Sequence, residues 1–239
     1  MIKFACICCT YKRPRELATV IECFLRQDYP REGRELIVLD DAGQYEEQAG
    51  DGWRIVSTSQ RFRTLGEKRN ASAALVGPDV HAYAVWDDDD IYLPHHLTAA
   101  AAALQAGEGA AYTIPTKILA YRAGQCREKG NTYLFHGAWT FYRGAFEAVH
   151  GYPFMQSGQD QALLKRFKSR KFPRADPIEH NPRPSYVYRW FDTHRTHISA
   201  MGPDGYEKLG RRHAKRVGRV RPRWGRNWVG LAANAKRKK

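Results

Sequence analysis

Residues 82–94 read AYAVWDDDDIYLP, a short apolar run that ends in four consecutive aspartates. The run predicts a buried strand over residues 82–86. Four neighbouring carboxylates repel one another strongly unless a cation lies among them. Carboxylate oxygens suit Mg²⁺ or Mn²⁺, which proteins hold with one or two carboxylates together with substrate phosphates. The alternative interpretation is a solvated acidic turn, or a cap by Asp90 on the helix that follows.

Two upstream apolar runs also end in polar clusters. Residues 3–10 (KFACICCT) predict a strand that leads into TYKR at residues 10–13. Residues 35–39 (ELIVL) predict a second buried strand, which ends in Asp40 and Asp41. In an open parallel sheet, ligands bind beyond the carboxyl ends of the strands. The three clusters are therefore expected to meet at one end of a sheet.

Helical patterns alternate with these strands. They predict helices over residues 16–26, 66–75 and 94–106, with a further strand over residues 53–57. This alternation predicts an α/β fold, Rossmann-like, with a mostly parallel sheet and helices on both faces. Beyond residue 110 the pattern changes, and the elements expected there are strands over 112–121, 132–142 and 185–190 and helices over 144–149 and 159–168.

Four motifs, in this order and at these separations, resemble the family 2 glycosyltransferases of the GT-A fold. They read TYKRP at residues 10–14, ELIVLDD at 35–41, GEKRN at 66–70 and WDDDDIYLP at 86–94. The resemblance implies a glycosyltransferase, hexosyltransferase-like, that uses a nucleoside-diphosphate sugar, with a UDP-sugar favoured, and Mn²⁺ or Mg²⁺. It spans residues 1–105 and continues more weakly to about residue 200. The expected domains are a GT-A catalytic domain at 1–205, with a nucleotide-sugar-binding part at 1–105 and an acceptor-binding part at 106–205, and a basic C-terminal helical tail at 206–239.

The resemblance also implies a pocket for the nucleobase. Asp41 would meet the base, and Tyr11 and Arg13 would line the pocket near Thr10. Asp40 is expected instead to make a turn hydrogen bond.

Further roles follow for the two downstream motifs. Arg69 would lie close to the nucleotide and Lys68 near the phosphates, with a helix surface as the alternative for Arg69. Asp89 would be the metal ligand, and Asp87 or Asp88 would lie nearer the sugar and ribose.

Transfer requires removal of a proton from the acceptor hydroxyl, and a carboxylate is the simplest general base. The family places an acid at the start of a late helix, often as Glu-Asp, where this chain has GQDQ at residues 158–161. The resemblance therefore implies Asp160 as the base, with inversion at the anomeric carbon. The alternative for Asp160 is a helix cap.

Two later segments complete the expected site. HGAW at residues 136–139 resembles the acceptor side, so His136 and Trp139 are candidate acceptor contacts, with a core position as the alternative for Trp139. YRWFDTHRTH at residues 188–197 resembles the closing segment in which a histidine completes the metal shell. Neutral imidazole is a ligand for Mn²⁺, and His197 is favoured over His194.

The net charge of +14 belongs to the C-terminal end. Residues 206–239 hold 13 Lys or Arg and one acid, which leaves 26 basic and 24 acidic residues in 1–205. Residues 206–220 have the outline of a basic amphipathic helix, and RPRWGRNW follows at 221–228. This pattern fits an anionic membrane surface or nucleic acid, where Trp can stack on bases. A solubilising tail is the remaining interpretation.

The apolar stripe of that predicted helix is thin for lipid, so the acceptor favoured is a hydroxylated base in DNA, as in phage-type DNA modification. A lipid-linked or cell-surface glycan at a membrane is the alternative. Two other classes stay open: a non-catalytic nucleic-acid-binding protein and a metal-dependent nucleotidyltransferase.

Several classes are excluded or disfavoured. No P-loop and no Gly-x-Gly-x-x-Gly motif occurs, which argues against an ATPase or a dinucleotide enzyme. No stretch approaches the roughly 20 apolar residues of a membrane span, and no export signal is expected at the start. Five cysteines, three of them within residues 6–9, predict reduced thiols. These features predict a cytoplasmic protein, in a phage-infected cell if the acceptor is DNA, with peripheral membrane association as the alternative.

Overall fold

A central sheet brings the carboxyl ends of the apolar strands together. The computed structural model describes residues 1–131, 133–190, 218–222, 224 and 226–235. The strand order of the eight-stranded sheet is β11-β7-β10-β5-β1-β2-β4-β3. Its strands are β1 (Phe4–Thr10), β2 (Arg34–Asp40), β3 (Gln48–Gly50), β4 (Trp53–Ser57), β5 (Ala82–Val85), β7 (Tyr112–Thr113), β10 (Thr140–Tyr142) and β11 (Arg174–Ala175). β1 pairs in parallel with β2 and β5, and β2 with β4, whereas β3 and β10 run antiparallel to their neighbours. The predicted α/β class with a mostly parallel sheet is confirmed.

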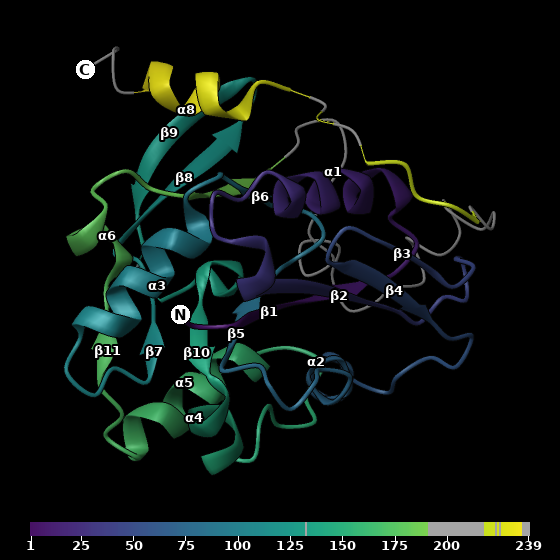
Figure 1. The fold of residues 1–239 in the computed structure, drawn as a ribbon, viewed down its shortest axis with the longest axis horizontal. Coiled ribbons are helices and arrows are strands. Elements are labelled where there is room, and N and C mark those ends of the chain that lie inside the picture. The colour runs from purple at the N-terminus through teal and green to yellow at the C-terminus, as the bar shows by residue number, and fades with distance from the viewer. Residues whose placement is uncertain (132, 191–217, 223, 225, 236–239) are drawn as a thin grey trace.

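Helices cover both faces of this sheet. The helices of the described chain are α1 (Pro14–Leu25), α2 (Leu65–Ala74), α3 (His96–Ala106), α4 (Arg143–Ala148), α5 (Gln159–Ser169), α6 (Pro177–His180) and α8 (Trp228–Ala235), with 3₁₀ turns η1 (Arg31–Gly33) and η2 (His136–Ala138). α1 lies on one side of the sheet, and α2, α4 and α5 lie on the other (Figure 1). α1 buries Leu17, Val20, Ile21 and Phe24, which recur at helical spacing. None of the helices in the described part of the chain is long and apolar enough to cross a membrane.

A second sheet begins directly after the four aspartates. Its strands are β6 (Ile91–Tyr92), β8 (Lys117–Arg122), β9 (Gln125–Gly130) and β12 (Tyr186–Arg189), in the order β6-β12-β8-β9. Residues 87–90, called the aspartate loop below, therefore link the two sheets. Trp86 is fully buried beneath this loop and stacks on Tyr92 with 3.8 Å between the ring centroids. The loop thus rests on a packed aromatic base.

Two predicted strands differ from the structure. The segment 112–121 contains two strands, β7 and β8, which belong to different sheets, and Pro115 lies between them. Among residues 133–142, only β10 is a strand, and His136–Ala138 forms the 3₁₀ turn η2. Gly137 in this turn approaches the aspartate loop closely, because a Cβ there would lie 3.1 Å from Oδ2 of Asp87. A regular strand is thus replaced by a turn that packs under the loop.

The C-terminal segment also differs from the predicted tail. Residues 206–217 lie outside the described residues, but Gly218 forms a parallel bridge with Tyr45, so the predicted helix does not reach residues 218–220. The N–H of Gly218 donates to the carbonyl of Gln44 at 3.0 Å. α8 lies over β8 and β9 (Figure 1), and Trp228 is only 3% exposed. Gly218, Val220 and Trp228 therefore pack against the part of the chain that carries the two sheets.

The five cysteines carry free thiols, as predicted. Cys6, Cys8, Cys23 and Cys126 are buried, and Cys9 is partly exposed. Burial raises the pKa of the Cys6 and Cys8 thiols, which keeps them neutral in the core.

Candidate active site

Arg13 lies between two of the aspartates and pairs with both. Lys12 has a φ of 55°, and this turn between β1 and α1 directs Arg13 toward the aspartate loop. Nη1 of Arg13 donates to Asp88 at 2.8 Å and to Asp89 at 2.7 Å, and the Thr10 hydroxyl donates to Asp88 at 2.7 Å. Arg13, Asp88 and Asp89 are each 5% exposed. Burial raises the pKa of Asp88, and the charge of Arg13 opposes that rise. One buried guanidinium thus forms ion pairs with two buried carboxylates.

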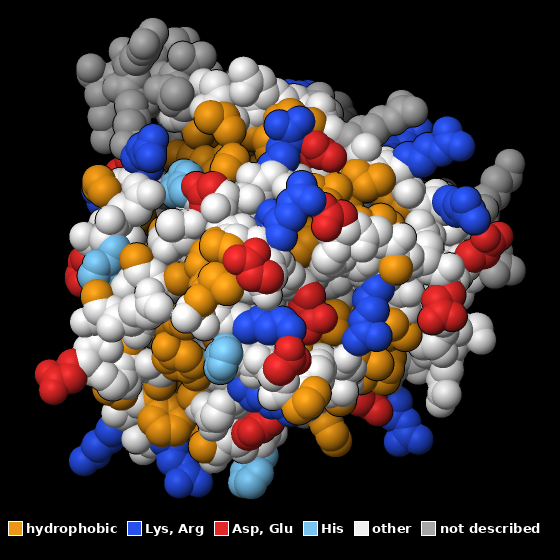
Figure 2. Space-filling view, in the orientation of Figure 1, with side chains coloured by type: hydrophobic (Ala, Val, Ile, Leu, Met, Phe, Trp, Pro, Cys, Tyr) orange, Lys and Arg blue, Asp and Glu red, His pale blue; other side chains and the backbone are white. Residues whose placement is uncertain are grey.

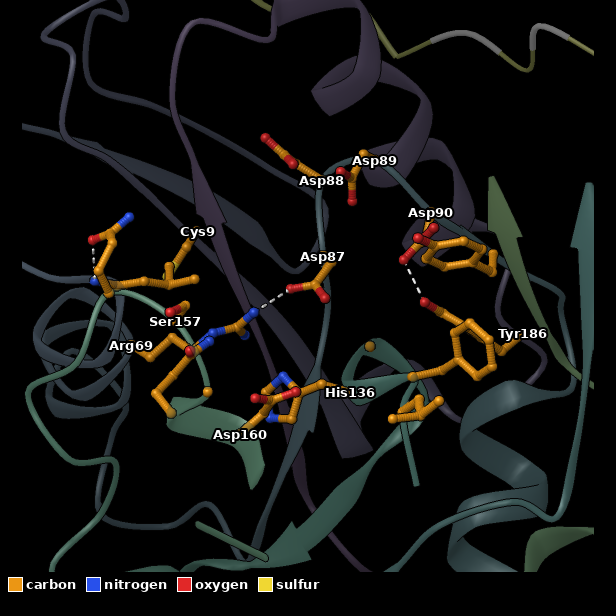
Figure 3. A pocket seen from close by; sticks show the side chains of 18 of the residues that line it. Cys9, Arg69, Asp87, Asp88, Asp89, Asp90, His136, Ser157, Asp160 and Tyr186 are labelled. Atoms are coloured by element: carbon orange, nitrogen blue, oxygen red, sulfur yellow. Dashed lines mark hydrogen bonds and ion pairs between the residues drawn. The ribbon is translucent and has the colours of Figure 1, made fainter. Parts of the chain in front are cut away.

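The two outer aspartates have partners of their own. Nη2 of Arg69 donates to Asp87 at 2.8 Å. Asp90 accepts from the Tyr186 hydroxyl and from the backbone N–H of Arg189, the latter at 3.0 Å. Figure 3 shows Asp87 directed toward Arg69 and Asp90 directed toward Tyr186. Every carboxylate of the loop is therefore paired by the protein. The four aspartates were expected to need a metal ion because of their mutual repulsion, but these partners already offset that repulsion.

A second buried ion cluster lies where the nucleobase pocket was predicted. Nζ of Lys68 donates to Asp41 at 2.6 Å and also to the carbonyl of Thr10, which joins this cluster to the first. Arg61 pairs with Asp41, and its guanidinium lies 3.7 Å from the centroid of the Tyr11 ring. Arg61 was not among the predicted site residues. Its position in the sequence could have indicated it, because Arg61 follows β4, which ends at the same edge of the sheet as the strand before Asp41.

Asp40 has the structural role that was predicted for it. Its carboxylate accepts from the backbone N–H groups of Ala42 and Gln44, at 3.1 and 2.9 Å, and from the Ser57 hydroxyl at 2.8 Å. These bonds close the turn after β2 and hold Asp41 at the end of the strand.

A cavity of about 770 Å³ opens in front of the aspartate loop. Arg13, Arg69 and residues 87–90 line one wall, and residues 134–137 and 156–160 line the facing wall. In Figure 3, Asp88 and Asp89 lie on one side of this space, and His136 and Asp160 lie on the other. Thr10, Tyr11, Asp41 and Lys68 do not line this cavity. The volume is in the range of small-molecule sites.

Asp160 projects into the cavity from the first turn of α5. The N-cap residue of α5 is Gly158, whose φ is 74°, so Asp160 does not cap the helix. No hydrogen bond or ion pair to its carboxylate occurs within the described ranges of the chain. The carboxylate lies in the acidic first turn of α5, beside the positive end of the helix. Asp160 therefore has the placement of a base that can accept a proton from a ligand in the cavity, and its role stays a prediction.

Of the two predicted acceptor contacts, only His136 reaches the cavity. Nε2 of His136 lies 3.0 Å from the Tyr152 hydroxyl, and burial lowers the pKa of His136 well below its usual range. Trp139 is 1% exposed and packs behind His136, with 4.9 Å between the ring centroids. Trp139 is therefore a core residue, and its predicted stacking on an acceptor sugar is not supported. The pattern of apolar residues in the sequence could not show that His136 lines the cavity while Trp139 lies in the core.

The helix that carries Arg69 is tied to the opposite wall. The Asn70 side chain donates to the carbonyl of Tyr152 at 2.8 Å and accepts from its N–H at 2.9 Å. Gly66 approaches Pro153 so closely that a Cβ would lie 1.9 Å from the carbonyl oxygen of Pro153. Asn70 and Gly66 thus fix the distance between Arg69 and the wall that holds Asp160.

The carboxylates of the loop have the chemistry that a divalent ion requires. Among the described residues, no three His, Cys, Asp or Glu side chains are grouped as a metal site. Mg²⁺ and Mn²⁺ nevertheless need only one or two protein carboxylates when donor phosphates supply further oxygens. Asp89 borders the cavity and meets this condition. The predicted ligand His197, and its competitor His194, lie outside the described residues.

The sequence matches the profile of Glycosyl transferase family 2 over residues 5–147. No curated protein sequence matches this chain.

Similar solved structures include those of two proteins with bound nucleotides or nucleotide sugars. The structure of S. aureus TarS 1-349 in complex with UDP has a TM-score of 0.62 at 13% identity, and the match covers 88% of this chain and 64% of that chain. The complex of the same protein with UDP-GlcNAc has a TM-score of 0.61 at 14% identity, with 89% and 66% covered. The mannosyltransferase PcManGT from Pyrobaculum calidifontis, in complex with GDP-Man and Mn²⁺, has a TM-score of 0.62 at 17% identity, with 98% and 69% covered. The chain thus spans about two thirds of the length of these structures, and the likeness shows the GT-A fold.

Proposed function

The chain belongs to glycosyl transferase family 2, and we propose that it transfers a sugar from a nucleoside-diphosphate donor to an acceptor hydroxyl, with inversion at the anomeric carbon. One observation carries this proposal. A single cavity has the aspartate loop with Arg13 and Arg69 on one wall and the Asp160 carboxylate on the facing wall. That arrangement leaves room for a donor and an acceptor between a charged binding surface and a base.

The charged side chains at the end of the sheet support a donor with a nucleobase and a diphosphate. Arg69 borders the cavity and is the residue proposed for the phosphates, with Lys68 behind it. Tyr11 and Asp41 are proposed for the base, with Arg61 already seated between them. Asp87 and Asp88 are proposed for the sugar and ribose. UDP is the favoured nucleotide, and the similar structures bind UDP, UDP-GlcNAc and GDP-Man.

Asp89 is the residue proposed to hold Mn²⁺ or Mg²⁺, with His197 as a further ligand. When bound, such an ion stabilises the negative charge that grows on the leaving diphosphate. Arg13 keeps the Asp89 carboxylate in place at 2.7 Å, and Arg69 keeps Asp87 in place at 2.8 Å. Both carboxylates are therefore oriented before any ligand arrives.

Asp160 is proposed to take the proton of the acceptor hydroxyl. The acceptor oxygen then forms a bond to the anomeric carbon, and the bond from that carbon to the diphosphate oxygen breaks. The electron pair of the broken bond leaves with the diphosphate. Attack from the side opposite the leaving group inverts the configuration.

Thermal melting with UDP and GDP, each with and without Mn²⁺, tests the donor. Metal-dependent stabilisation by a nucleoside diphosphate is expected, because a ligand that binds the folded state raises the melting temperature. A donor screen that detects released nucleoside diphosphate then identifies the sugar. No stabilisation in any combination would contradict the proposal.

The acceptor proposed from the sequence, a hydroxylated base in DNA, is supported mainly by positive charge. Trp228 is buried, so its ring is not presented for base stacking, and one face of the Trp224 ring lies under the Arg26 guanidinium at 4.7 Å. The face in Figure 2 carries acidic and basic side chains interspersed rather than one basic surface. Replacing Arg219, Arg221 and residues 236–239 with glutamine, followed by DNA-binding and liposome-flotation assays, separates the two acceptor classes. Loss of flotation without any DNA binding would favour a lipid-linked or cell-surface glycan.

A further inference from the structure

The C-terminal helix α8 contacts Arg189, and Arg189 forms hydrogen bonds to the aspartate loop. We propose that Trp228 is a positioning residue for the aspartate loop and acts through Arg189. The inference rests on the proposed function of this loop in binding the donor and the metal. It concerns a residue that lies outside the span of the family match, which ends at residue 147.

Arg189 joins the loop at two points. Its Nε donates to the backbone carbonyl of Asp89 at 2.6 Å, and its backbone N–H donates to the Asp90 carboxylate at 3.0 Å. Arg189 is the last residue of β12 and is 4% exposed. Because Nε belongs to the side chain, the bond to Asp89 holds only while that side chain keeps its conformation. The orientation of Asp89, the proposed metal ligand, therefore depends on Arg189.

Trp228 restricts the Arg189 side chain from the other side. The Arg189 guanidinium lies 5.9 Å from the centroid of the Trp228 ring, and the Tyr121 ring lies 5.1 Å from it at 84°. Tyr121 is paired with Arg189 across β8 and β12, so the two contacts share one patch of the second sheet. An arginine has many rotamers, and burial against an aromatic face removes most of them. If Trp228 is removed, the Arg189 guanidinium can adopt other rotamers and become hydrated.

The same segment supplies a matched control. Trp224 also packs on an arginine, Arg26, but that residue is the C-cap of α1 and pairs with Glu22. Replacing Trp224 removes an equal ring from the same C-terminal segment without touching Arg189. A role in stability alone predicts no change confined to the loop for either tryptophan, whereas the positioning role predicts an effect on the loop for Trp228 only.

The experiment compares Trp228→Ala, Trp228→Phe and Trp224→Ala in the full chain. Hydrogen exchange is measured first, because it needs no ligand. In Trp228→Ala, the peptide that covers residues 87–92 is expected to exchange faster, while the peptide that covers residues 40–44 is unchanged. The affinity for Mn²⁺, measured from the electron paramagnetic resonance spectrum of the free ion, is expected to fall about tenfold. Trp228→Phe should keep the exchange rate of residues 87–92 and the Mn²⁺ affinity close to those of the wild type. Trp224→Ala should change neither.

Two results would overturn the inference. One is wild-type exchange at residues 87–92 in a folded Trp228→Ala variant, and the other is equal acceleration in Trp224→Ala. If the wild-type chain binds neither Mn²⁺ nor UDP, the proposed function fails. The exchange measurement still decides whether Trp228 holds the loop, so the two failures are distinguishable.

Discussion

Replacing Arg13 with methionine tests whether this residue is the cation on which the aspartate loop depends. Methionine fills much of the same space but carries no charge. Arg13, Asp88 and Asp89 are each 5% exposed, and Arg13 is 2.8 and 2.7 Å from the two carboxylates. Removing one partner of a buried pair leaves an uncompensated charge, which costs about 3–5 kcal/mol. We expect the free energy of unfolding to fall by about that amount near neutral pH.

Urea unfolding, followed by the fluorescence of the six tryptophans, measures this loss. Arg15→Met is the control, because Arg15 is exposed on the same helix and its replacement should cost less than about 0.5 kcal/mol. Asp88→Asn in the Arg13→Met background should recover part of the loss, since it removes one of the two unpaired charges. Mn²⁺ should also recover part of it, because an ion on Asp89 replaces the missing positive charge.

The pH dependence gives the sign of the effect. Burial raises the pKa of Asp88, and Arg13 is the largest influence that lowers it, so this pKa rises further in Arg13→Met. A carboxyl group whose folded pKa exceeds its unfolded pKa favours the folded state at low pH, and that contribution is lost as pH rises through the folded pKa. The deficit of the variant should therefore be smaller near pH 5 than near pH 8. A deficit below about 1 kcal/mol, or one that is equal at both pH values, would refute the reasoning.

Three further predictions concern other parts of the molecule. Asp160→Asn should lower turnover about 10²- to 10⁴-fold with unchanged UDP affinity, measured by released UDP and by calorimetry; retained turnover would remove Asp160 as the base. Burial lowers the pKa of His96 to about 3 from an ordinary value of 6.5, so stability is lost as pH falls from 6.5 toward 3. That loss is about 2 kcal/mol between pH 7 and pH 5, and urea midpoints of His96→Phe should lack it; an unchanged slope would contradict the assignment. Gly66→Ala should lower stability by about 1–3 kcal/mol, read as a lower melting temperature, because its Cβ would lie 1.9 Å from the carbonyl oxygen of Pro153. A melting temperature like that of the wild type would show that this approach is loose.

The first half of the fold was predictable because local patterns there agree with the tertiary structure. Apolar runs became β1, β2 and β5, and the stripe that begins at Leu17 became the buried face of α1. The prediction of a single strand over residues 112–121 was wrong, because this apolar run contains two strands that belong to different sheets. Alternation over residues 112–121 indicates extended backbone, but it carries no information about which neighbour each strand pairs with. β3 was missed because a three-residue edge strand has too few residues to show a period.

The sequence by itself determined that Thr10, Asp41 and the aspartates meet at one end of a parallel sheet, because the strand ends set that position. Only the tertiary structure decided the partners. Arg13 reaches Asp88 and Asp89 across 75 and 76 residues of chain, and Arg69 rather than another cation reaches Asp87. The tertiary structure also buried Trp139, a candidate through the family resemblance, and Trp228, a candidate through the basic and aromatic pattern of residues 221–228. The physical reason is that strand and helix patterns are local, whereas ion pairs and burial depend on which distant segments pack together.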